Sequence, residues 1–179
     1  MSTHLISDEY RALQRAAHKD PAYGQASVAA APLVAAALEQ RGAQEILDYG
    51  AGKGRLGNEL AALAPEVWVA DYDPAIPGWD APPAPCAFVA CVDVLEHVEP
   101  DRLDAVLADL HRVTVGVLFV TIATGPSKRI LADGRNAHLI QQPEEWWRVR
   151  LAKYFEVVEE YPGHNGLVAL LTRRADDNS

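Results

Sequence analysis

The apolar residues of the chain follow two different patterns, and the change between them lies near residue 44. Residues 7–19 carry apolar side chains at helical spacing. Residues 27–40 are rich in alanine, the strongest helix former, and Gly42 follows them as a stop signal. Beyond residue 44, short apolar runs of strand length alternate with helical stretches. The pattern therefore predicts two N-terminal helices followed by a mixed α/β region.

The region after residue 44 is expected to form a sheet with helices between its strands. Strands are predicted at 45–48, 67–70, 88–92, 115–122, 155–161 and 167–172, and helices at 55–63, 101–113 and 143–155. The segment Pro162–Gly166 is a hairpin signal between the last two strands. The alternation predicts a Rossmann-like, mostly parallel α/β sheet that ends in an antiparallel hairpin. We expect one domain over 1–179, with helices in 1–42 and an α/β core in 43–179.

Composition and net charge limit the kinds of partner that the chain is expected to bind. The 179 residues carry a formal net charge of -9, which disfavours broad binding to nucleic-acid phosphates. No apolar run is long enough to span a membrane, and residues 1–20 lack the apolar core of a signal peptide. Cys86 and Cys91 are expected to be reduced packing residues, since they show no repeated metal-ligand spacing. A cytoplasmic location follows as an expectation, and the oligomeric state stays open.

A glycine-rich loop is the sharpest feature of the chain. It follows an apolar strand that ends in Asp48, has glycines at positions 50, 52 and 54, and precedes a predicted helix. Glycine allows a tight turn and a close approach of a ligand, and the helix start presents free N–H groups. A ligand is therefore expected at the carboxyl edge of the first strand. A purely structural turn is the alternative. A dinucleotide fingerprint does not fit, because it needs a glycine three residues after Gly52. Here the glycines that follow Gly52 lie at 54 and 57, and Gly57 is five residues away.

A second acidic signal follows 17 residues after Gly54, where Asp71 ends the second predicted strand. A carboxylate there can accept hydrogen bonds from both hydroxyls of a ribose, and Tyr72 beside it could stack on adenine. The alternative is that Asp71 and Asp73 only begin a turn before Pro74.

From about residue 44 to 122 the chain resembles the class I S-adenosylmethionine-dependent methyltransferases, in their small-molecule branch. The segments that carry the resemblance are 46–54, 69–71 and Cys91–His97. The resemblance implies S-adenosylmethionine as cofactor, with its methionine part cupped by the glycine loop and its ribose held by Asp71. It places Asp93 beside the methyl group. The cofactor-binding residues that we expect are Asp48, Gly50, Ala51, Gly52, Asp71, Tyr72 and Asp93.

The chain departs from this family between Asp71 and Phe88. The family has a helix and a strand there, which end in a residue that contacts the adenine amino group. Here the segment contains five prolines, which argue against a helix. We therefore expect a loop in place of both elements and a sheet that is one strand short, and no adenine-amino contact can be named.

The expected acceptor site is the polar segment 124–143, which follows a central strand at its carboxyl end. It resembles a loop of bacterial and phage methyltransferases of unassigned substrate. The segment is basic in an otherwise acidic chain and could hold a phosphate or carboxylate. The expected substrate-binding residues are Lys128, Arg135, Asn136 and His138, with Arg129 nearby. A solvated surface loop is the alternative.

Asp93, His97 and His138 are the candidate catalytic residues. Either histidine could act as a general base, or the reaction could need little acid–base help because the sulfonium is already a strong electrophile. No metal site is expected, since the histidines show no ligand spacing. Residues of the N-terminal helices could form a lid or simply pack; these are Tyr10, Arg11, His18 and Tyr23.

The favoured function is methyl transfer to an oxygen or nitrogen of a small, anionic molecule, for which a free nucleotide is one candidate. Two alternatives remain open. A nucleic-acid base methyltransferase typically carries an Asp/Asn/Ser-Pro-Pro-aromatic motif where this chain has Asp93-Val-Leu-Glu96. A non-catalytic adenosyl-binding or partner module would fit the shortened segment before Phe88.

Overall fold

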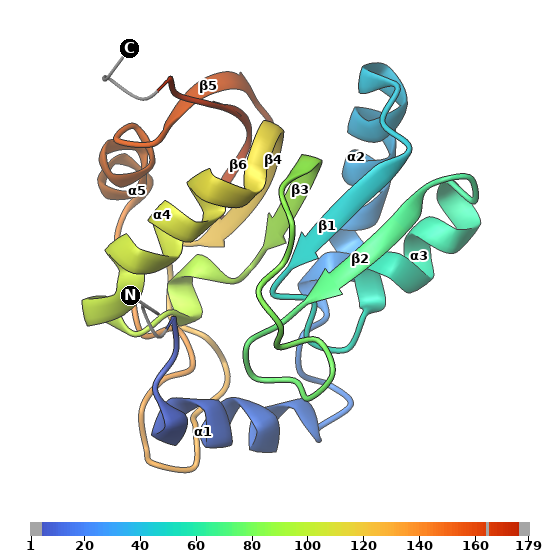
Figure 1. Ribbon diagram of the computed structural model, residues 1–179. Coiled ribbons are helices and arrows are strands. Elements are labelled where there is room, and N and C mark those ends of the chain that lie inside the picture. The colour runs from blue at the N-terminus through green and yellow to red at the C-terminus, as the bar shows by residue number, and fades with distance from the viewer. Residues whose placement is uncertain (1–4, 164, 176–179) are drawn as a thin grey trace.

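The computed structural model describes residues 5–163 and 165–175, which form a six-stranded sheet in the order β2-β1-β3-β4-β6-β5 (Figure 1). The strands are β1 Glu45–Tyr49, β2 Trp68–Tyr72, β3 Cys86–Val92, β4 Thr114–Ala123, β5 Phe155–Glu160 and β6 Gly166–Arg173. The first four strands pair in parallel, while β6 pairs antiparallel with both β4 and β5. The predicted Rossmann-like sheet with a C-terminal antiparallel hairpin is confirmed. Residue 164, in the expected hairpin turn, lies outside the described residues.

Helices cover both faces of this sheet. They are α1 Asp8–His18, α2 Ala26–Arg41, α3 Arg55–Leu63, α4 Leu103–Val113 and α5 Glu144–Leu151, with short 3-10 turns at Leu95–His97 and Pro100–Arg102. Helices α2 and α3 pack on one face, and α4 and α5 pack on the other. Helix α4 buries its apolar stripe because residues three and four positions apart share one side of a helix.

The segment between β2 and β3 contains neither a helix nor a strand within 73–85, as its prolines predict. The segment folds back on itself, and the Asp73 N–H donates to the Trp79 carbonyl oxygen at 2.9 Å. Strand β2 is consequently an edge strand of the sheet, and the expected shortening is confirmed.

The helices bury one apolar cluster on each face of the sheet. A smaller apolar cluster lies beyond the carboxyl ends of the parallel strands, where α1 crosses the edge of the sheet (Figure 1). Tyr10 and Ala17 of α1 pack there against Ala75, Leu131 and Ala137 of two loops. Helix α1 therefore covers the edge where open α/β sheets bind ligands. In the described part of the chain, no helix combines the length and apolarity needed to cross a membrane.

Candidate active site

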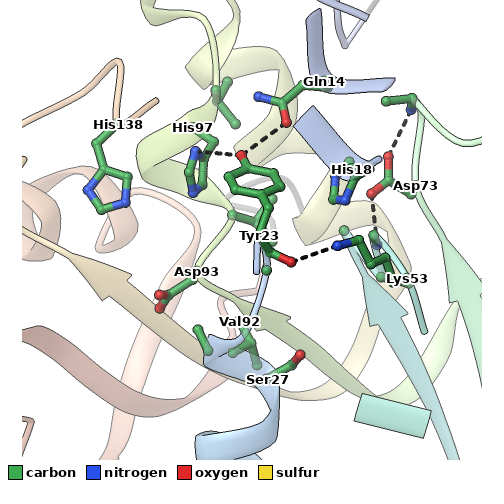
Figure 2. A pocket seen from close by; sticks show the side chains of 18 of the residues that line it. Gln14, His18, Tyr23, Ser27, Lys53, Asp73, Val92, Asp93, His97 and His138 are labelled. Atoms are coloured by element: carbon green, nitrogen blue, oxygen red, sulfur yellow. Dashed lines mark hydrogen bonds between the residues drawn. The ribbon is translucent and has the colours of Figure 1, made fainter. Parts of the chain in front are cut away.

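A cavity of about 840 Å³ opens at the carboxyl edge of the sheet. Its walls come from α1, the α1–α2 linker, the glycine loop, the end of β3 and the loop after β4 (Figure 2). The predicted site residues that line it are Asp48, Gly50, Ala51, Gly52, Asp93, His97, Lys128 and His138. Four others do not line it, namely Asp71, Tyr72, Arg135 and Asn136. The fold thus brings most of the predicted site together.

The glycine loop forms one end of the cavity and requires glycine at two positions. Gly50 and Gly52 have φ angles of 88° and 57°, which other residues rarely adopt. A Cβ on Gly50 would lie 2.4 Å from Cγ2 of Val94, and one on Gly52 would lie 2.7 Å from Cε1 of His18. Side chains would therefore both strain the backbone and collide with the cavity wall.

Asp73, for which the sequence predicts only a role in a turn, also lines the cavity. Its Oδ2 accepts the N–H of Gly52 at 2.9 Å, and its Oδ1 accepts the N–H of Ala75 at 2.8 Å. The second bond is the expected turn before Pro74. The first ties this turn to the glycine loop across the cavity floor, a contact that no local pattern could show.

Asp48 and Asp71 lie opposite each other in the parallel register of β1 and β2. Burial, then the charges of Asp71 and Asp73, raise the pKa of Asp48 to about 8. Burial also raises the pKa of Asp71, whose Oδ1 has no hydrogen-bond partner among the described residues. The other carboxylate oxygen of Asp71 lies near Gly54, against which the ring of Trp79 also packs. Asp71 thus sits beside the glycine loop, behind the cavity wall.

Tyr72 is buried and packs on Tyr49, with ring centroids 4.9 Å apart. Its carbonyl oxygen accepts the N–H groups of Gly50 and Ala51 at 2.7 and 3.0 Å. The backbone of Tyr72 therefore helps to shape the glycine loop, while its ring lies in the core.

Asp93 closes β3 with a left-handed backbone, φ 52°, the only positive φ among the described non-glycine residues. Its N–H donates to the carbonyl oxygen of Thr121, and the Thr121 hydroxyl donates to Asp93 Oδ1 at 2.7 Å. Such strain persists only where neighbours hold it, and it concentrates at functional sites. The carboxylate points into the cavity (Figure 2).

His97 and His138 meet in the cavity wall, with ring centroids 4.8 Å apart and planes at 86°. The Nδ1 of His97 donates to the Ala137 carbonyl oxygen at 2.7 Å. Burial, and secondarily the neighbouring His138, lower the pKa of His97 to about 4. His97 is therefore neutral at neutral pH and a weaker base than its type suggests.

The basic loop after β4 turns only part of its polar side chains to the cavity. Lys128 and Arg129 line it. Arg135 instead pairs with Asp133 at 2.6 Å. Asn136 bonds within the loop, because its side chain accepts the N–H groups of residues 127 and 138 and donates to the Ser127 carbonyl oxygen. Arg135 and Asn136 thus hold the loop in shape.

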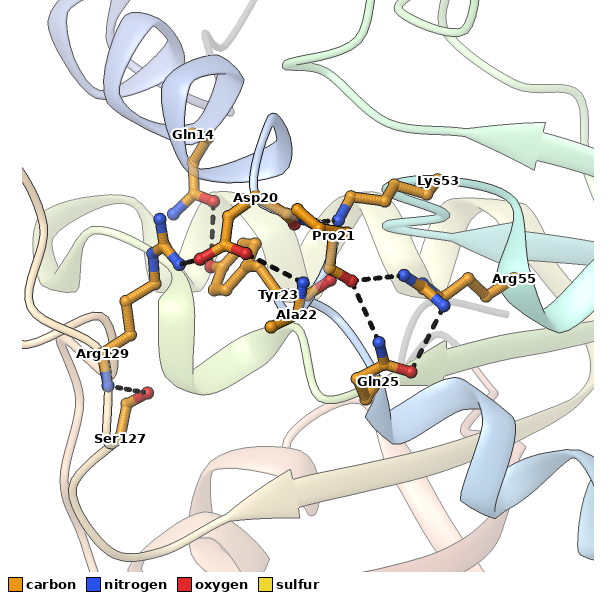
Figure 3. A network of polar contacts seen from close by, with 10 residues as sticks. All are labelled: Gln14, Asp20, Pro21, Ala22, Tyr23, Gln25, Lys53, Arg55, Ser127 and Arg129. Carbon is orange, nitrogen blue, oxygen red and sulfur yellow. Dashed lines mark hydrogen bonds and ion pairs between the residues drawn. The ribbon is translucent and has the colours of Figure 1, made fainter.

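Residues 20–25, which we call the strap, cross the cavity between α1 and α2 (Figure 3). The Lys53 ammonium of the glycine loop donates to the carbonyl oxygens of Asp20 and Tyr23, the latter at 3.0 Å. Arg55 donates to the Pro21 carbonyl oxygen at 2.6 Å. Arg129 pairs with the Asp20 carboxylate at 2.6 Å. The strap therefore connects the glycine loop with the basic loop.

The proposed lid residues lie on this same side of the cavity. Tyr10, His18 and Tyr23 line it, whereas Arg11 does not. The Tyr10 hydroxyl donates to the His97 carbonyl oxygen at 2.6 Å. Helix α2 packs on the sheet and lines the cavity only with Ala26 and Ser27 at its N-terminus.

Comparisons with known proteins agree with this geometry. A family model described as a methyltransferase domain matches residues 16–164. None of the curated proteins matches the chain in a sequence comparison.

Several solved structures share the fold. One is a Burkholderia thailandensis 1,6-didemethyltoxoflavin-N1-methyltransferase with bound 1,6-didemethyltoxoflavin and S-adenosylhomocysteine. It matches at 19% identity and a TM-score of 0.66, over 98% of this chain and 92% of that one. The mitomycin 7-O-methyltransferase MmcR matches at 20% identity and a TM-score of 0.65, over 91% of this chain and 60% of that one.

Human N-acetylserotonin methyltransferase in complex with S-adenosylmethionine also matches. Its identity is 15% and its TM-score 0.61, over 94% of this chain and 56% of that one. This chain thus spans somewhat more than half the length of the second and third structures. At these identities the likeness supports the fold.

Proposed function

Given that this chain belongs to the class I S-adenosylmethionine-dependent methyltransferases, we propose that it methylates an oxygen or nitrogen of a small, anionic molecule. A free nucleotide is one candidate acceptor. The structures that share its fold support a small acceptor, because the substrates in their names are themselves small molecules.

One observation carries the proposal. One cavity is lined both by the glycine loop and by Lys128, Arg129 and His138 of the basic loop. Its volume of about 840 Å³ lies within the usual range of small-molecule sites, about 300–1,000 Å³. A glycine loop and basic side chains in one cavity support transfer to an anionic acceptor.

The glycine loop and the end of β2 are expected to hold the cofactor. Gly50, Ala51 and Gly52 leave room for the methionine part of the cofactor, with Asp48 behind them. We assign the ribose to Asp71, because its Oδ1 has no hydrogen-bond partner within the described ranges and can accept a hydroxyl hydrogen. Since Asp71 does not line the cavity, this contact requires a rearrangement of the neighbouring wall, where Trp79 packs beside Gly54. Tyr72 contributes through its backbone.

The acceptor end is expected to work mainly by positioning. When bound, S-adenosylmethionine supplies an electrophilic methyl group on a sulfonium. Asp93 is held by Thr121 beside that end of the cavity, and Lys128 attracts the anionic group of the acceptor. Arg129 adds to this attraction only with the donors that its ion pair with Asp20 leaves free. The strap excludes water. A strong base is not needed, which agrees with the low pKa of His97.

The test is calorimetric titration of the protein with S-adenosylhomocysteine, followed by a methylation screen of nucleotides and other anionic metabolites. We expect micromolar or tighter binding and methyl transfer to at least one anionic acceptor. Absence of binding would remove the cofactor assignment. Transfer only to uncharged acceptors would remove the anionic one.

A further inference from the structure

Three side chains from two segments converge at the acceptor end of the cavity. Glu96 and His97 follow β3, and His138 lies in the loop after β4. Each offers one potential metal-binding atom, and these atoms lie within 4.8 Å of one another. Both histidines line the cavity, while Glu96 is fully buried behind them.

Hydrogen bonds fix the same tautomer in both histidines. His97 Nδ1 lies 2.7 Å from the Ala137 carbonyl oxygen, and His138 Nδ1 lies 2.7 Å from the Gly125 carbonyl oxygen. A carbonyl only accepts, so each Nδ1 carries the hydrogen and each Nε2 keeps its lone pair. This carbonyl-bound arrangement is the one found behind metal-binding histidines, where it orients the ring and raises its donor strength.

Glu96 supplies an unexplained buried oxygen. Its Oε1 accepts the N–H of Ala123 at 2.8 Å. Its Oε2 is buried and has no hydrogen-bond partner among the described residues. A buried polar oxygen without a partner is costly, and a bound cation is one group that relieves the cost.

From this geometry we propose that Glu96, His97 and His138 bind one divalent transition-metal ion, with Zn²⁺ as the expected occupant. Two imidazoles and one carboxylate suit Zn²⁺, which binds such atoms at about 2.0–2.2 Å. Two ligands of one tetrahedral ion then lie about 3.4 Å apart. Side-chain rotations that move the ligand atoms by about an ångström would bring them from their present separation to this distance.

The site would leave one coordination position open, because three protein ligands are fewer than a tetrahedral ion takes. Since the two histidines form the cavity wall, that position faces the cavity. An anionic oxygen or a hydroxyl of the acceptor is the group that fits there. Metal binding itself does not depend on the proposed methyl transfer and can be measured without cofactor.

The experiment is a calorimetric titration of tag-free, chelator-treated protein with ZnCl₂ alone. We expect one ion per chain with micromolar or tighter affinity. His138→Ala and Glu96→Gln should each weaken binding at least about a hundredfold, since even partners behind the ligands are worth about 10–100-fold. Glu96→Gln keeps the size of the side chain and can retain the bond from Ala123. His111→Ala is the matched control, because His111 lies outside the cavity and contacts Tyr154 and Phe155.

Three outcomes overturn the site. The parent does not bind Zn²⁺ below millimolar concentration, or His138→Ala binds it as tightly as the parent, or His138→Ala weakens binding while Glu96→Gln leaves it unchanged. Thermal melts of the variants separate loss of a ligand from loss of the fold. Titration with S-adenosylhomocysteine on the same samples separates the outcome from the proposed function, because the cofactor end contains none of these three residues.

Discussion

Asp71 allows the sharpest test at the scale of a single residue. Its Oδ1 is buried and has no hydrogen-bond partner in the described part of the chain, and the carboxylate lies beside the glycine loop. We predict that Asp71→Ala weakens S-adenosylhomocysteine binding by roughly ten- to a hundredfold, because hydrogen bonds to charged groups contribute about 1.5–3 kcal/mol. Calorimetric titration measures the change. Asp101→Ala, an exposed position in the 3-10 turn before α4, should bind like the parent. Equal affinity of parent and Asp71→Ala would refute the ribose assignment.

Asp48 makes a prediction about pH. The carboxyl has a pKa of about 8 in the folded chain against about 3.9 when unfolded. Between about pH 4 and pH 8 the folded state therefore holds a proton that the unfolded state has released. Stability is lost as pH rises through this window, by up to about 1.4 kcal/mol per pH unit from this group. Asp48→Asn resembles the protonated carboxyl at every pH.

We therefore expect Asp48→Asn to exceed the parent in unfolding free energy at pH 8, and the gap to shrink toward pH 5. Urea titrations of the cofactor-free protein at several pH values measure this gap. A constant gap across the range would contradict the buried, protonated state of Asp48.

At the scale of elements, the strap is held by side chains of the two loops that it connects. Lys53 binds two strap carbonyl oxygens, so Lys53→Ala should release the strap from the glycine loop. We predict faster amide hydrogen exchange in residues 20–25 and faster dissociation of S-adenosylhomocysteine, with little change in melting temperature. Lys153→Ala, an exposed lysine after α5, is the control. Unchanged exchange in the strap would show that Lys53 does not hold it.

At the scale of the whole molecule, net charge favours a small molecule over a nucleic acid as the acceptor. A chain with a net charge of -9 should not shift duplex or single-stranded DNA in a gel, even at about 50 mM salt, where phosphate contacts are strongest. Saturable binding that salt abolishes would instead revive base methylation. A basic DNA-binding protein of similar size provides the positive control.

The sequence predicted every strand and helix of the described chain to within a few residues, because each element has its own local pattern. Helix α4 shows a 3.6-residue period, and β4 is a mostly apolar run of strand length. The expected helix at 143–155 was the poorest match, since α5 ends at Leu151 and β5 begins at Phe155. The loop in place of the family's helix and strand followed equally well from its prolines.

The sequence by itself determined the fold class, the glycine loop and its family, since these depend on residue types at fixed spacings. Only the tertiary structure decided which polar groups face the cavity. It turned Arg135 toward Asp133, gave Asp73 the N–H of Gly52, and brought His138 to His97. The contacts of Asp73 with Gly52 and of His138 with His97 join segments that are distant in sequence. The pairing of Arg135 with Asp133 is one of several pairings that are chemically equivalent. Their formation depends on how the loops pack at the edge of the sheet, which no local spacing encodes.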